Sequence, residues 1–118
     1  MAFVPAVLVA AGIAVLSLWE QPVAPVKIAL SDKLVHGVMY AVLAASLMGA
    51  FVYIRRAKWT VYMAVGLFAT AYGALMEILQ RYCTLYRSAE MADLYADAIG
   101  AVIGLIIIGL WHMCMTSR

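Results

Sequence analysis

Four long apolar stretches occupy most of this 118-residue sequence and limit what it can fold into. Hydrophobic residues make up 68% of the chain and charged residues only 12%, and the mean hydropathy is +1.01. An α-helix needs about 20 residues to cross the roughly 30 Å hydrocarbon layer of a membrane. We therefore predict an all-α, integral membrane four-helix bundle that uses residues 1–118 as a single domain. The predicted membrane helices cover residues 3–19, 34–54, 59–79 and 93–115.

Prolines delimit the first apolar stretch. Pro5 lies where a helix tolerates proline, in its first turn, and Gln21 and Pro22 followed by Pro25 end the helix. No Lys or Arg precedes this stretch and no clear small-residue cleavage site follows it. We therefore expect it to be a membrane helix and not a removable signal peptide.

A short basic turn gives the expected orientation. With four crossings, Lys and Arg residues are equally numerous on the two sides of the membrane. However, Arg55, Arg56 and Lys58 lie within four residues of one another between the second and third helices. Positive charges close to the membrane in short loops favour the cytoplasmic side. We therefore expect both termini in the cytoplasm.

Polar residues recur at helical spacing where the second helix begins, the third ends and the fourth begins. Ionisable side chains at the edge of the hydrocarbon layer are costly, so they indicate a functional site. Residues three or four apart share one helix face, which would turn His36, Glu77, Asp93 and Asp97 into one recess that opens away from the cytosol. The predicted ligand-binding residues are Asp32, Lys33, His36, Tyr40, Glu77, Gln80, Arg81, Arg87, Glu90, Asp93 and Asp97. A role as simple interfacial markers stays open for Asp32, Lys33, Arg81 and Arg87.

Small residues continue the same faces into the membrane. Gly66, Thr70 and Gly73 precede Glu77 on the third helix, and Gly100 with Gly104 forms a GxxxG pair on the fourth. Small residues allow helix backbones to approach closely in lipid. We expect these positions to serve helix packing.

Four ordered motifs resemble the VanZ-like family, small bacterial membrane proteins named for a member linked to resistance against the glycopeptide teicoplanin. The motifs are LSLWEQP (16–22), SDKLVHGVMY (31–40), YGALMEILQ (72–80) and YRSAEMADLYADAIGAVIG (86–104). Together they extend over most of the chain. The resemblance implies a multi-pass protein of the bacterial inner (cytoplasmic) membrane, a place in the cell envelope and a link to antibiotic resistance.

The family pattern carries over residue by residue with two departures. Glu90 stands where the family usually has Asp, and Asp97 stands where Asn is common. The second change removes an amide donor and adds an ionisable group. The matching positions are Gln21, Pro22, Asp32, Lys33, His36, Tyr40, Glu77, Gln80, Arg87, Asp93 and Gly100.

Three functions remain open. The first is binding of an anionic envelope lipid, a lipid-linked cell-wall precursor or a glycopeptide-related ligand, with Lys33, Arg81 and Arg87 contacting phosphate. The second is a membrane-embedded hydrolase or transferase. The third is an accessory subunit of a larger membrane complex. The expected partners are therefore membrane lipids, a lipid-linked precursor or other membrane subunits.

The enzyme hypothesis rests on one histidine and several carboxylates. His36, Glu77, Asp93 and Asp97 are the catalytic candidates, because a histidine beside a carboxylate suits acid–base chemistry. Glu77, Asp93 and Asp97 are the metal-ligand candidates, and oxygen ligands suit a divalent cation such as Mg²⁺ or Ca²⁺. The sequence contains neither a Gly-x-Ser-x-Gly motif nor a phosphate-binding glycine loop.

The charge pattern excludes one class of partner. The net charge is +2, and no basic stripe or soluble domain accompanies it. A nucleic acid is therefore not an expected partner.

Overall fold

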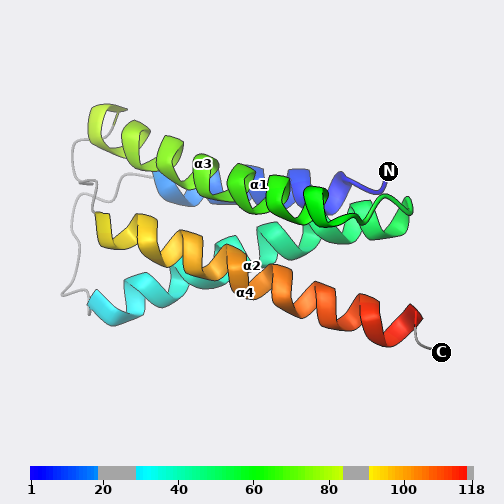
Figure 1. Ribbon diagram of the computed structural model, residues 1–118. Helices are drawn as coiled ribbons and strands as arrows, with labels where there is room; N and C mark the ends of the chain where they lie inside the picture. The colour runs from blue at the N-terminus through cyan, green and yellow to red at the C-terminus, as the bar shows by residue number, and fades with distance from the viewer. Residues whose placement is uncertain (19–28, 84–90, 117–118) are drawn as a thin grey trace.

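The computed structural model describes residues 1–18, 29–83 and 91–116, which form four α-helices and, within those ranges, no strand (Figure 1). The helices are α1 (Val4–Leu18), α2 (Ala29–Tyr53), α3 (Trp59–Cys83) and α4 (Met91–Thr116). The predicted all-α membrane fold is confirmed.

The described part of the first helix is shorter than a typical membrane span. α1 has 15 residues, or about 22 Å at 1.5 Å per residue. Among the described residues, three helical segments are long and apolar enough to cross a membrane: Leu34–Tyr53, Trp59–Leu79 and Leu94–Thr116. The first predicted stretch, 3–19, contains a shorter apolar helix within the described residues. Trp19 lies outside those residues, so the full length of this stretch stays a prediction.

Three helices continue beyond their apolar spans at the same end of the bundle. α2 begins at Ala29, ahead of Asp32 and Lys33, α3 continues past Arg81 to Cys83, and α4 begins at Met91, ahead of Asp93. We call this end, where α1 and α3 end and α2 and α4 begin, the polar end. Both chain termini lie at the opposite end (Figure 1). The helices therefore alternate in direction, as expected for successive crossings.

The basic turn joins α2 to α3 at the end opposite the polar end, which we call the basic-turn end. The amide of Arg56 donates a hydrogen bond to the carbonyl of Phe51 (2.8 Å), and the amide of Arg55 donates to the carbonyl of Val52 (3.0 Å). This is the Schellman pattern that closes the C-terminus of a helix. Arg55 takes the left-handed position with φ 61°. The carbonyl of Lys58 then accepts the first hydrogen bonds of α3.

α4 packs most extensively against α2. A Cβ added at Gly100 would overlap the backbone of Gly37, and one added at Gly104 would overlap the backbone of Ala41. The two helix backbones are therefore in direct contact at these positions. This confirms that the GxxxG pair of α4 serves helix packing.

α1 and α3 complete the core from the other side. Within the described residues, α1 contacts α2 and α3 but not α4. The hydroxyl of Tyr72 on α3 donates a hydrogen bond to the carbonyl of Ala10 on α1 (2.6 Å). The Phe3 ring packs edge-on against Phe51 at 5.1 Å between centroids. The buried apolar core comprises Ile13, Tyr40, Leu43, Ala44, Met48, Val65, Ala69, Met76 and Ala101.

Apolar side chains cover the outside of the bundle. In each described span, at most 33% of the most apolar 18-residue stretch is buried against the rest of the protein. The remainder lies on the outer surface of the bundle. The exposed faces carry large apolar residues such as Leu67, Ile103 and Ile107. A surface of this kind is stable in lipid and would aggregate in water.

Replacing Gly100 with Ala is expected to lower the free energy of unfolding by about 1–3 kcal/mol, the usual cost of overpacking. The added methyl group would meet backbone atoms of α2, which cannot rotate away as a side chain can. Unfolding in mixed detergent–dodecyl sulfate micelles measures the effect. Gly12→Ala is the matched control, because nothing lies within 4 Å of its added Cβ. Equal stability of the two variants would contradict the close contact.

Replacing Tyr72 with Phe is expected to cost about 0.6 kcal/mol, the average for hydrogen bonds between membrane helices. The ring would keep its packing and lose only the bond to Ala10. The same unfolding measurement applies. Tyr53→Phe should have no effect, since Tyr53 is 80% exposed. An unchanged midpoint for Tyr72→Phe would show that this bond does not hold α1 in place.

Candidate functional site

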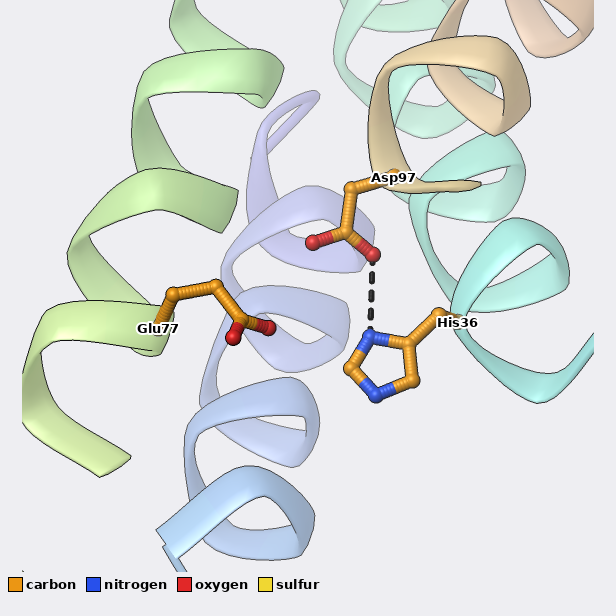
Figure 2. Close-up of side chains that lie close together, drawn as sticks. All are labelled: His36, Glu77 and Asp97. Atoms are coloured by element: carbon orange, nitrogen blue, oxygen red, sulfur yellow. Dashed lines mark hydrogen bonds and ion pairs between the residues drawn. The ribbon is translucent and has the colours of Figure 1, made fainter. Parts of the chain in front are cut away.

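Three helices each contribute one buried ionisable side chain to a cluster near the polar end. His36 comes from α2, Glu77 from α3 and Asp97 from α4. Their exposed fractions are 5%, 7% and 1%. Figure 2 shows the imidazole and the two carboxylates turned toward one another between the helices. We call these three residues the His–Glu–Asp cluster.

The cluster is compact. His36 Nδ1 and Asp97 Oδ1 lie 3.0 Å apart, at hydrogen-bond distance (Figure 2). One ligand-type atom from each of the three residues lies within 4.8 Å of the other two. Groups this close in a medium of low dielectric interact strongly. We therefore expect the charges of the three groups to influence one another.

The close packing of α2 and α4 explains the position of His36 and Asp97. Gly37, next to His36, lies against Gly100, which is three residues after Asp97. Because the helix backbones touch there, the two polar side chains reach each other across the interface. A larger residue at position 100 would separate them.

Gly73 provides the space for the Asp97 carboxylate on the side of α3. A Cβ at position 73 would lie 2.8 Å from Asp97 Oδ2. Gly73 is four residues before Glu77, so both face the same interface. Sequence reasoning assigned Gly73 to packing between helices and missed its contact with a carboxylate. Its helical spacing from Glu77 was the signal.

Tyr40 lies one turn after His36 and is only 1% exposed. Its ring centroid is 6.4 Å from that of Tyr72. Within the described part of the chain, its hydroxyl has no hydrogen-bond partner. Buried hydroxyl groups are nearly always hydrogen-bonded, so this oxygen is available to a group outside the described residues.

Some of the predicted site residues lie close together in the structure, and the side chains of others are outside the described part of the chain. His36, Glu77 and Asp97 come together, and Tyr40 is buried one turn from His36. Arg81 is exposed near the end of α3. The side chains of Asp32, Lys33, Gln80 and Asp93 are not described, and Arg87 and Glu90 lie outside the described residues. Functional roles for all of these residues stay predictions.

Two described grooves are apolar and lie away from the cluster. One, of about 560 Å³, lies between α3 and α4 toward the basic-turn end and is lined by residues such as Trp59, Leu105 and Met113. The other, of about 520 Å³, lies between α2 and α3 and includes Phe51 and Phe68. The His–Glu–Asp cluster lines neither groove, so the expected open polar pocket stays a prediction.

The cluster has two chemical capacities. A histidine hydrogen-bonded to a carboxylate can accept or deliver a proton. An imidazole and two carboxylates from different helices can also ligate a divalent cation. The three residues that the structure brings together are His36, Glu77 and Asp97. The metal ligands predicted from the sequence were Glu77, Asp93 and Asp97. A nitrogen ligand favours transition metals over Mg²⁺ or Ca²⁺.

Comparison with protein families gives one match. A family model described as VanZ/LLP1 matches residues 3–112, which includes every residue of the His–Glu–Asp cluster. The chain matches no curated protein. It matches no solved structure either. Because the match covers nearly the whole chain and agrees with the four motifs, this membrane protein belongs to the VanZ/LLP1 family.

Proposed function

We propose that this protein binds the anionic headgroup of an envelope lipid at the polar end of its bundle. The observation that carries the proposal is the depth of the His–Glu–Asp cluster. His36 lies three residues after Lys33, Glu77 four residues before Arg81, and Asp97 four residues after Asp93. Each is thus within about 6 Å, along its helix, of a charged residue that bounds the apolar stretch. Lipid phosphates and glycerol esters occupy that depth.

Arg81 supplies a positive charge beside the cluster. It follows Glu77 by one helical turn on α3 and is exposed. Its guanidinium lies 5.8 Å from the centroid of the Tyr82 ring, a cation–π distance that limits where the side chain points. The planar guanidinium can donate paired hydrogen bonds to a phosphate. Lys33 and Arg87 would add charge from the neighbouring segments.

The chemical class of the ligand is a phosphate-bearing lipid. Such a lipid places its acyl chains along the apolar outer faces and its phosphate at Arg81. A lipid-linked cell-wall precursor shares this chemistry, because its phosphate also sits at the membrane surface. The proposal concerns the headgroup phosphate and covers both sources.

Replacing Arg81 with Ala is expected to lower the affinity for anionic lipid by roughly 10- to 100-fold, because a charged hydrogen bond contributes about 1.5–3 kcal/mol. Mass spectrometry of lipids retained by the detergent-purified protein measures this. Native spectra after addition of phosphatidylglycerol or a polyprenyl phosphate would separate the two sources.

Arg56→Ala is the matched control for that experiment. Arg56 is also exposed, but it lies in the basic turn at the other end of the bundle. It should leave binding at the polar end unchanged. If Arg81→Ala and Arg56→Ala retain the same lipids in the same amounts as the unaltered protein, the proposed headgroup site does not exist.

The polar end would face the outside of the inner membrane. Exposed Arg55, Arg56 and Lys58 at the other end support this orientation, through the preference of short basic loops for the cytoplasm. Both termini would then be cytoplasmic. A site on the outer side would meet lipids and precursors after they have crossed the membrane.

The two native cysteines test the orientation. Cys83 ends α3 at the polar end, and Cys114 is exposed in the last turn of α4 at the other end. A membrane-impermeant maleimide added to intact spheroplasts is expected to label Cys83 in the Cys114→Ser variant. It should label Cys114 in the Cys83→Ser variant only after lysis. The reverse pattern would place the proposed site in the cytoplasm.

A further inference from the structure

The His–Glu–Asp cluster places two carboxylates and an imidazole inside the helix bundle near its polar end. Its members are at most 7% exposed, so water contributes little to their solvation. Burying negative charges close together is costly unless positive charge joins them. A divalent cation bound by all three residues would supply positive charge directly at the two carboxylates.

The geometry is suitable for a single ion. Zinc binds histidine nitrogen and carboxylate oxygen at about 2.0–2.2 Å, so ligand atoms on one ion lie no more than about 4 Å apart. In the cluster the corresponding atoms lie within 4.8 Å of one another. Small side-chain adjustments would therefore bring all three onto one metal. Because each ligand comes from a different helix, the ion would also tie α2, α3 and α4 together.

The surroundings of the cluster also fit a bound ion. Asp97 Oδ1 and His36 Nδ1 lie 3.0 Å apart, a separation that two ligand atoms on one ion can have. The buried Tyr40 hydroxyl, which has no hydrogen-bond partner among the described residues, lies near Asp97 and Glu77. That hydroxyl could bond to a water on the metal. Its burial is a second observation, independent of the ligand set.

We infer that His36, Glu77 and Asp97 form a binding site for a divalent transition-metal cation, of which Zn²⁺ and Mn²⁺ fit the mixed nitrogen and oxygen ligands best. The inference does not rest on the lipid proposal, because the ion would bind whether or not a lipid is present. It would add a Lewis acid at headgroup depth, where it could polarise a phosphate oxygen or activate a water. That chemistry would favour the membrane-embedded hydrolase or transferase over a purely binding role.

The test measures metal in the full-length protein after removal of any affinity tag, because tag histidines bind metal themselves. The protein is stripped with a chelator, incubated separately with Zn²⁺, Mn²⁺ and Mg²⁺, and desalted before elemental analysis. We expect about one equivalent of Zn²⁺ or Mn²⁺ per chain and much less Mg²⁺. His36→Gln, Glu77→Gln and Asp97→Asn should each lose most of this metal.

His112→Gln is the matched control, since His112 lies on α4 near the basic-turn end and away from the cluster. It should keep its metal. The unaltered protein provides a second readout that needs no variant: its melting temperature should rise with added Zn²⁺ or Mn²⁺, because a ligand that binds only the folded state stabilises it.

Two results would overturn the inference. The first is that the unaltered protein binds less than about a tenth of an equivalent of each ion and that its melting temperature does not change when metal is added. The other is equal metal retention in His36→Gln and His112→Gln. Lipid retention measured on the same samples keeps the two proposals separate, because loss of metal with unchanged lipid, or the reverse, identifies which of them fails.

Discussion

The backbone contact between α2 and α4 determines the arrangement of the other parts of this bundle. Gly100 and Gly104 lie against the backbone at Gly37 and Ala41, with no room for a side chain between them. In lipid, apolar side chains gain little by leaving their surroundings, so close packing has to hold the helices together. The same contact brings His36 and Asp97 within 3.0 Å of each other. Packing and candidate chemistry therefore depend on the same small residues.

The depth of the His–Glu–Asp cluster balances two opposing requirements. Near the middle of the membrane, three ionisable groups would be far more costly to bury. Beyond the helix ends, water would weaken their mutual interaction. Within about one turn of the charged residues that bound the apolar stretches, the groups are enclosed by three helices yet close to the headgroup layer. The lipid and the metal proposals both use this depth, one through Arg81 at the surface and the other through the buried ligands.

α1 has a different role from the other helices. It is described over 15 residues and contacts only α2 and α3 among the described helices. The Tyr72 hydroxyl anchors it by bonding to the carbonyl of Ala10. α1 thus covers the side of the bundle opposite α4, and within the described residues it adds no side chain to the His–Glu–Asp cluster.

The sequence by itself determined the membrane class, the helices and the faces that turn inward. Hydropathy and length identify α2, α3 and α4, and helical spacing correctly put His36, Glu77 and Asp97 on buried faces. These properties are local, since each depends on residues within a few turns of one helix. The GxxxG spacing likewise predicted that Gly100 and Gly104 serve packing.

Only the tertiary structure decided which residues meet. It pairs His36 with Asp97, seats the Asp97 carboxylate against Gly73 and leaves the Tyr40 hydroxyl buried near both carboxylates. These contacts depend on how far each helix is rotated and shifted against its neighbours, which hydropathy does not specify. The sequence therefore predicted the residues of the cluster, whereas the packing of three helices placed the imidazole beside the two carboxylates and so suggested the metal proposal.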